Sequence, residues 1–169
     1  MDTKVVTLLN EQVNKEFFSA YLYLSFANYF EGRGLSGFAN WYQVQAQEER
    51  DHAMLMVKFL QNNDEQLTYE AIKKPENSWE NELEVLKNGL AHEKYITASI
   101  NNIYATAIDS KDYRVTQFLD WFIKEQGEEE TNVSIIIKKA ELIGIESKGI
   151  YMLDQELATR VYAAPSLVI

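Results

Sequence analysis

The sequence predicts an all-α protein, a four-helix bundle with one long crossover connection and a short fifth helix. Four long stretches of the 169-residue chain have an amphipathic helical pattern. Both prolines, Pro75 and Pro165, lie outside these stretches and leave them free to be helical. Two of the connections between the stretches are short and one has about 15 residues, which is long enough to run along a bundle.

The first two predicted helices form the N-terminal half of the bundle. The first covers about residues 2–30 and ends at the glycine-rich sequence Gly32-Arg33-Gly34. The second starts near Ser36, a predicted N-cap, and continues to about Asn62. The short connection between them predicts an antiparallel hairpin.

The C-terminal half repeats this arrangement after the long connection at residues 63–77. A third helix is predicted to start at Asn77 or Ser78, with Glu80 as a capping-box partner, and to end at residues 109–111. The fourth covers residues 112–144, and the short fifth covers 150–160. The long connection predicts that the second and third helices are parallel. We expect one domain, residues 1–162, followed by an apolar tail, residues 163–169.

Composition narrows the classes of function. The chain has no cysteine, which excludes disulfides, thiolate metal sites and iron–sulfur clusters and suits a cytoplasmic location. Its formal net charge is −10, which disfavours nucleic acid and anionic membrane surfaces and favours cations. The most apolar stretch, Phe17 to Phe30, is interrupted by polar residues and is too short to span a bilayer, so no membrane partner is expected.

Metal-type ligands lie near the middle of all four long helices. They are Glu16, Glu49-x-x-His52, Glu93 and Gln126-x-x-Glu129. Residues at i and i+3 share one helix face and can reach the same ion. Singly, each glutamate is more simply interpreted as a solvated surface residue. Together, at one level of a bundle, they predict a cage for two metal ions, and oxygen ligands with one imidazole favour iron or manganese.

Four stretches of the sequence have a distinctive pattern: Leu9-Asn10-Glu11-Gln12 through Tyr21-Leu22-Tyr23-Leu24-Ser25, Ala46-Gln47-Glu48-Glu49-Arg50-Asp51-His52-Ala53, Ser99-Ile100-Asn101-Asn102-Ile103, and Trp121-Phe122-x-x-Glu125-Gln126-Gly127-Glu128-Glu129-Glu130. Together they resemble the bacterial non-haem ferritins, members of the ferritin-like di-iron carboxylate family, and the resemblance covers essentially the whole chain. The fourth helix has no second histidine, unlike that of bacterioferritins. Arg50 replaces the methionine that holds haem in bacterioferritins, so haem is not expected.

The resemblance implies iron ligands residue by residue. One iron would be held by Glu16, Glu49 and His52. The second would be held by Glu49, Glu93 and Glu129, with Gln126 close by. The family's third iron position matches Glu48, Glu125, Glu128 and Glu129. Glu49, Tyr23 and Gln126 are the residues implied to act in catalysis; Trp121 matches a nearby aromatic residue, with core packing as an equal alternative.

The implied activity is that of a ferroxidase and iron store. Such a protein oxidises Fe(II) with O₂ or H₂O₂ and stores ferric oxo-hydroxide inside a cage of 24 identical subunits. Three alternatives remain. One is a rubrerythrin-like or bacterioferritin-like di-iron oxidase or peroxidase, and another is a helical scaffold without metal chemistry. The third, a DNA-binding mini-ferritin, is disfavoured by the acidic charge.

Overall fold

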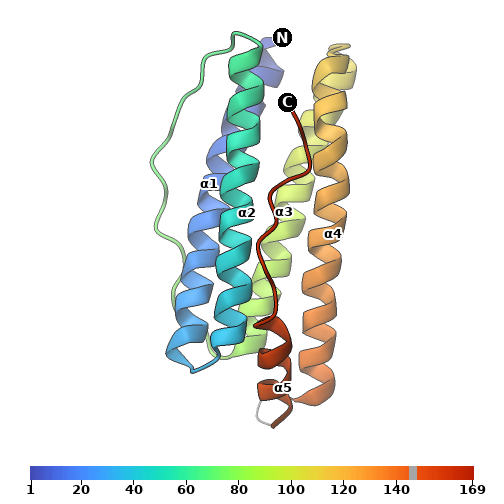
Figure 1. Ribbon diagram of the computed structural model, residues 1–169. Helices are drawn as coiled ribbons and strands as arrows, with labels where there is room; N and C mark the ends of the chain where they lie inside the picture. The colour runs from blue at the N-terminus through green and yellow to red at the C-terminus, as the bar shows by residue number, and fades with distance from the viewer. Residues whose placement is uncertain (145–147) are drawn as a thin grey trace.

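The computed structural model describes residues 1–144 and 148–169 and confirms the predicted all-α fold. Within these residues there is no β-strand, and Figure 1 shows four long helices and a short fifth one. In chain order the helices are α1 (Thr3–Gly32), α2 (Ser36–Asn62), α3 (Glu82–Asp109), α4 (Tyr113–Ile143) and α5 (Lys148–Leu157). None of these helices is long and apolar enough to cross a membrane.

The long helices form two antiparallel pairs joined by a connection that runs the length of the bundle (Figure 1). Helix α1 pairs with α2, helix α3 pairs with α4, and α1 also packs on α3. The connection follows α1, where the Asn10 side chain accepts a hydrogen bond from Thr68 N (2.8 Å) and Asn14 accepts one from Glu70 N (2.7 Å). The predicted parallel orientation of α2 and α3 follows from this path.

The N-cap of α2 and the start of α3 differ from the sequence prediction. Helix α2 begins at Ser36, and its N-cap is Leu35, which makes no side-chain hydrogen bond, so the predicted Ser36 cap is wrong. The Ser36 hydroxyl donates instead to Glu31 (3.2 Å). The cap is supplied from far along the chain, because the Asp154 carboxylate of α5 accepts a hydrogen bond from Phe38 N (3.0 Å).

The predicted start of α3 at Asn77 or Ser78 is also wrong. The helix begins at Glu82, after the N-cap Asn81, whose side chain accepts from Glu84 N (3.0 Å). Residues 77–80 stay extended over α1, where the Trp79 ring packs edge-on against the rings of Phe26 and Tyr29. Packing of the large indole outweighs the local capping signal at Asn77.

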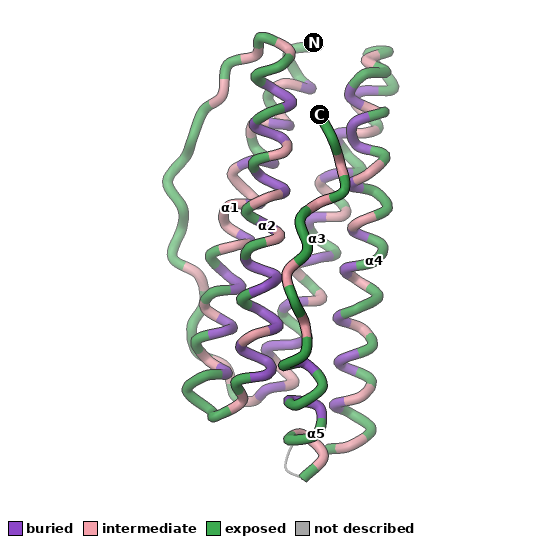
Figure 2. Tube along the Cα trace, in the orientation of Figure 1, coloured by how far each residue is buried: buried purple, intermediate pink, exposed green. Residues whose placement is uncertain are grey.

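Buried positions run along the inner faces of the long helices (Figure 2); they form two apolar clusters, with a band of buried polar residues between them. One cluster, near α5, is rich in aromatic rings and includes Phe26, Phe30 and Phe38. The other, toward the opposite end, is mostly aliphatic and includes Leu9 and Met56. The polar band therefore sits near the middle of every long helix, walled off at both ends.

Residues 158–169, here called the C-terminal strap, run back along the bundle between α2 and α4 (Figure 1). On the α2 side, Asn40 Nδ2 donates to Arg160 O (3.0 Å) and the Tyr162 hydroxyl donates to Asp51. On the α4 side, Trp121 Nε1 donates to Ser166 Oγ (3.0 Å). Helix α5 ends at Leu157 rather than at the predicted residue 160, because the chain turns there into the strap.

Candidate metal centre

All four long helices turn polar side chains into the buried band. Their exposed fractions are between 1% and 6%: Glu16 on α1, Glu49 and His52 on α2, Glu93 on α3, and Gln126 and Glu129 on α4. Burial of a charged carboxylate is costly unless a cation or hydrogen bonds compensate. Four buried glutamates that meet between two apolar clusters therefore need a shared partner.

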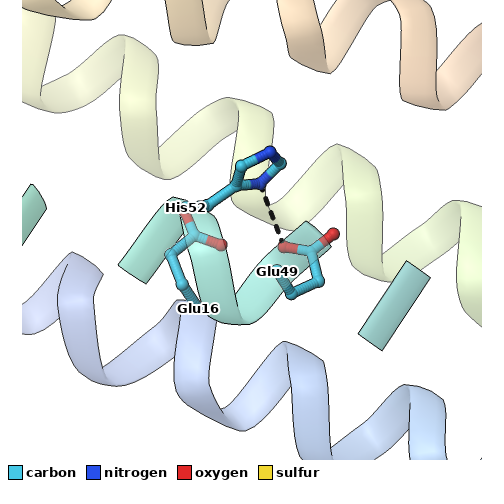
Figure 3. A group of neighbouring side chains, drawn as sticks. All are labelled: Glu16, Glu49 and His52. Atoms are coloured by element: carbon cyan, nitrogen blue, oxygen red, sulfur yellow. Dashed lines mark ion pairs between the residues drawn. The ribbon is translucent and has the colours of Figure 1, made fainter. Parts of the chain in front are cut away.

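The first group of ligand atoms joins α1 and α2. Figure 3 shows Glu16, Glu49 and His52 facing one another, and one ligand atom from each lies within 4.8 Å of the others. His52 Nδ1 lies 3.5 Å from Glu49 Oε2. The spacing Glu49-x-x-His52 places both side chains on one face of α2, as expected for residues at i and i+3.

The second group joins α2, α3 and α4. Oxygen atoms of Glu49, Glu93 and Glu129 also lie within 4.8 Å of one another. Glu49 belongs to both groups, so its carboxylate lies between them. The structure thus brings together the two ligand sets that the family resemblance implies, and places them side by side with one shared residue.

The residues implied for a third metal position are only partly brought together. Glu125 and Glu129 form a third group with His52. Glu48 does not join this group and pairs with Arg160 instead. The Glu128 side chain is exposed, and its Oε1 lies 3.7 Å from Lys124 Nζ.

Three buried carboxylate oxygens have no hydrogen-bond partner among the described residues. They are the Oε2 atoms of Glu16, Glu49 and Glu129. Buried polar atoms are normally satisfied, so each orphan needs an explanation. All three belong to the groups above, and hard oxygen donors of this kind, with one imidazole, suit a divalent first-row metal such as iron. The residues present therefore fit two neighbouring cations.

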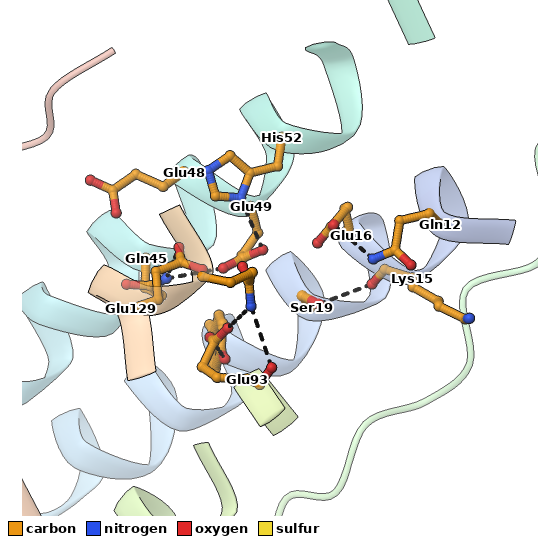
Figure 4. A network of polar contacts seen from close by, with 12 residues as sticks. Gln12, Lys15, Glu16, Ser19, Gln45, Glu48, Glu49, His52, Glu93 and Glu129 are labelled. Atoms are coloured by element: carbon orange, nitrogen blue, oxygen red, sulfur yellow. Dashed lines mark hydrogen bonds and ion pairs between the residues drawn. The ribbon is translucent and has the colours of Figure 1, made fainter. Parts of the chain in front are cut away.

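The other oxygen of each of these three glutamates is held by a glutamine (Figure 4). Gln12 Nε2 donates to Glu16 Oε1 (2.8 Å). Gln45 Nε2 donates both to Glu49 Oε1 (3.0 Å) and to Glu129 Oε1 (2.9 Å). Hydrogen bonds of this kind orient metal ligands and tune them.

Sequence reasoning missed Gln12 and Gln45. A signal was present, because each glutamine precedes a ligand glutamate by four residues and therefore lies on the same helix face.

Gln126 and Tyr23 both contact Glu93. Gln126 Nε2 lies 3.2 Å from Glu93 Oε2 and 3.3 Å from Glu93 O, and the Tyr23 hydroxyl donates to Glu93 Oε1. Both oxygens of Glu93 are therefore hydrogen-bonded in this state. The structure places the Gln126 amide as a hydrogen-bond donor beside Glu93, a member of the second ligand group.

Burial and mutual repulsion raise the pKa values of three carboxyl groups. The pKa values of Glu16 and Glu129 lie well above the usual range, chiefly because of burial and then because of the charge of Glu49. The same two causes raise the pKa of Glu93 to about 8. Near neutral pH without metal, Glu93 therefore holds a proton, and the raised pKa values of Glu16 and Glu129 favour their protonated forms; an arriving cation displaces such protons.

Glu49 and His52 form the charged pair of the band. Burial alone would raise the pKa of Glu49, but the hydrogen bond and charge of His52 outweigh it and lower the pKa below its usual value. Burial alone would likewise lower the pKa of His52, but Glu49 raises it to about 9. The charged imidazole thus compensates the carboxylate that the two ligand groups share.

Aromatic rings surround these ligands. The Trp121 ring packs edge-on against the His52 ring, with the ring centroids 5.5 Å apart, as expected for a packing role beside the ligand. His92, the neighbour of Glu93 in the chain, is half-buried. Its Nε2 lies 2.7 Å from Ser19 Oγ, and its ring packs edge-on against Tyr23.

Fold and site together define a class: four-helix bundles that bind a pair of metal ions with carboxylates and histidine contributed by all four helices. Comparison with known proteins agrees. The ferritin-like domain family matches residues 6–143. The chain therefore belongs to the ferritin family.

Curated relatives match nearly the full length of the chain. The bacterial non-heme ferritin of Campylobacter jejuni is 37% identical over 155 residues, covering 92% of this chain and 93% of the relative. That of Staphylococcus epidermidis is 34% identical over 162 residues, covering 96% and 98%. Among solved structures, a ferritin from Archaeoglobus fulgidus described as an open pore ferritin has a TM-score of 0.93 and 38% identity, covering 95% of this chain and 99% of its own.

Proposed function

We propose that the protein stores iron and is a ferroxidase. It oxidises Fe(II) to Fe(III) with O₂ at an intrasubunit di-iron site and deposits ferric oxo-hydroxide inside a cage of 24 like subunits in the cytoplasm. One observation carries this proposal: two buried ligand groups share Glu49 and contain three carboxylate oxygens without a described hydrogen-bond partner. Family membership supports iron as the cation.

Each ligand group takes one Fe(II) ion as substrate. Glu16, Glu49 and His52 bind the first ion, and Glu49, Glu93 and Glu129 bind the second. Binding displaces the protons held by the raised-pKa carboxyl groups and by His52, so the bound pair becomes charge-compensated. The apolar clusters at both ends exclude water from the pair.

The iron pair itself supplies the redox chemistry, because each Fe(II) gives one electron to O₂. The chain's residues hold the two ions next to each other. Tyr23 and Gln126 fix Glu93 through hydrogen bonds. Tyr23 is buried beside Glu93, and its phenol ring is suited to donate an additional electron. Glu125 and Glu129 support a third iron position; Glu48 and Glu128 join it only after leaving Arg160 and Lys124.

Assembly into a cage of like chains rests on the similar solved structures. Those from Archaeoglobus fulgidus are described as an open pore ferritin and as an engineered closed form. In each comparison at least 95% of this chain is covered, so the same bundle is available for such an assembly. Exposed apolar residues on α1 and the long connection, among them Tyr21, Leu24 and Ile72, are suited to contacts between copies.

The test is the amount of O₂ consumed per Fe(II) added to iron-free protein. We expect rapid uptake near one O₂ per two Fe(II), because a pair of ions delivers two electrons. Glu93→Ala removes a ligand of the second group and should slow uptake by about 10- to 100-fold. Glu141→Ala, which removes an exposed carboxylate of α4 paired with Lys87, is the matched control and should behave as wild type.

If wild type, Glu93→Ala and buffer all consumed O₂ at the same rate, the catalytic proposal would fail. Oxidation by H₂O₂ but not by O₂ would identify a peroxidase instead.

A further inference from the structure

Arg160, in the C-terminal strap, contacts Gln45, the residue whose amide donates to two carboxylates of the ligand groups. Its Nη1 donates to Gln45 Oε1 (3.0 Å), and its Nη2 pairs with Glu48 Oε2. The guanidinium also lies over the Trp41 ring, with its central carbon 4.4 Å from the ring centroid, and Nη1 donates to Trp41 O (3.2 Å). These contacts fix the guanidinium from three sides.

The donor and acceptor rules allow only one orientation of the Gln45 amide beside Arg160. A guanidinium has donors and no acceptor, so it must face the amide oxygen. The amide NH₂ group then faces the other way, where it donates to Glu49 Oε1 and Glu129 Oε1. Without Arg160 the amide can flip and accept a hydrogen bond from a protonated carboxyl group.

This orientation determines which carboxylate oxygens remain for metal. Gln45 occupies the Oε1 atoms of Glu49 and Glu129, and the Oε2 atoms of both have no described hydrogen-bond partner, although Glu49 Oε2 lies 3.5 Å from His52 Nδ1. We infer that Arg160 is a positioning residue for the di-metal site: through the Gln45 amide it holds Glu49 and Glu129 with one oxygen of each turned toward metal. The inference rests on the proposed function, because it assigns both carboxylates to metal binding.

Charge alone and positioning predict opposite changes in metal affinity when Arg160 is removed. The direction of that change therefore tests the inference. Arg160 is a cation close to the carboxylate cluster, so its removal should strengthen cation binding if charge alone matters. Loss of positioning should weaken binding, because supporting residues of metal ligands typically contribute about 10- to 100-fold in affinity or activity. The sign of the change in affinity for one variant therefore shows which of the two effects is larger.

The experiment titrates iron-free protein with Co(II) and records its visible d–d absorption, which reports ligand geometry. We expect Arg160→Met to bind the Co(II) ion of the Glu49, Glu93 and Glu129 group about tenfold more weakly, with an altered spectrum. Arg160→Lys keeps the charge but loses the planar fork, so it should fall between wild type and Arg160→Met. Gln45→Leu should reproduce the Arg160→Met effect.

The double variant Arg160→Met/Gln45→Leu tests whether Arg160 acts through the amide. We expect no further loss beyond Gln45→Leu alone, whereas additive losses would overturn the inference. Tyr162→Phe is the control, because it removes another strap contact to α2, the bond to Asp51, and leaves Arg160 in place. Equal losses in Tyr162→Phe and Arg160→Met would mean that a loosened strap, not Arg160, matters.

Unchanged or tighter Co(II) binding in Arg160→Met would also overturn the inference. The Co(II) readout does not depend on oxidation. A wild type that binds two Co(II) per chain without oxidising Fe(II) would refute the ferroxidase proposal, and the Arg160 comparison would still decide the positioning role.

Discussion

Glu93 shows what burial does to a single residue of the iron-free protein. Its pKa is raised to about 8, so the folded chain keeps a proton that the unfolded chain releases near 4.5. The stabilising contribution of this residue is therefore complete below about pH 4.5 and is lost as the pH rises through 8. The neutral isostere Glu93→Gln lacks this dependence.

We expect Glu93→Gln to reduce the loss of unfolding free energy between pH 5 and pH 8 by about 1–3 kcal/mol relative to wild type. Urea unfolding of chelator-treated protein at several pH values measures this difference. Glu16 remains in both proteins; the charge of Glu93 raises the pKa of Glu129, so the contribution of Glu129 also falls in the variant and adds to the difference. Parallel pH curves for the two proteins would show that Glu93 does not carry a raised pKa.

The site residues that could be predicted from the sequence were those whose side chains are typical metal ligands. Glutamate and histidine at i and i+3 on amphipathic helices pointed to a buried polar band, and the structure brings these residues together. Gln12 and Gln45 were missed because glutamine is ordinary on a helix surface. Arg160 lies more than a hundred residues from Gln45, and no local pattern connects a loop arginine to a helix so far away.

The start of α2 depends on α5. Phe38 N finds its acceptor in Asp154, and an added methyl group at Gly37 would lie 1.7 Å from Asp154 O. We expect Asp154→Ala to lower the free energy of unfolding by about 0.5–2 kcal/mol, as for loss of an N-cap. Asp154→Asn keeps an acceptor and should lose less. Chemical unfolding measures both, and equal stability of Asp154→Ala and wild type would exclude this capping role.

Gly127 lies in the middle of the continuous helix α4, among the ligands. A methyl group added there would meet nothing within 4 Å in the described chain. Glycine in a helix interior costs about 0.5–1 kcal/mol relative to alanine. We therefore expect Gly127→Ala to raise the melting temperature of the iron-free protein. Gly89→Ala is the contrasting variant, because its methyl group would lie 3.0 Å from the Tyr42 hydroxyl oxygen and should destabilise α3 packing. Destabilisation by Gly127→Ala would reveal a packing role for Gly127.

Helix existence and pairing were predictable, whereas the start of α3 and the N-cap of α2 were not. Long amphipathic patterns and connection lengths are local properties, and they predicted four long helices with α2 parallel to α3. The start of α3 depends on where the Trp79 ring packs, and the start of α2 depends on a carboxylate from another helix. Both are tertiary effects that override local capping propensity.

The strap gives the whole molecule a contact between α2 and α4 on the face that it covers. Residues 163–169 contribute the Trp121–Ser166 hydrogen bond and the half-buried Leu167. A chain truncated after Tyr162 should lose about 1 kcal/mol of stability and keep Fe(II) oxidation within about twofold of wild type, because Arg160 remains. A chain truncated after Ala158 should oxidise Fe(II) more slowly, and Arg160→Met should do the same, because both lack the Arg160 guanidinium. Thermal unfolding and stopped-flow oxidation measure both, and equal rates in the two truncated chains would contradict the expectation.

The position of Arg160 in the chain has a consequence for how the protein is made. A ribosome synthesises every ligand-bearing helix before it reaches Arg160. The contact between Arg160 and the Gln45 amide therefore involves a segment that is made after all the ligands, and the strap supplies the last side chain to join the metal site in the order of synthesis.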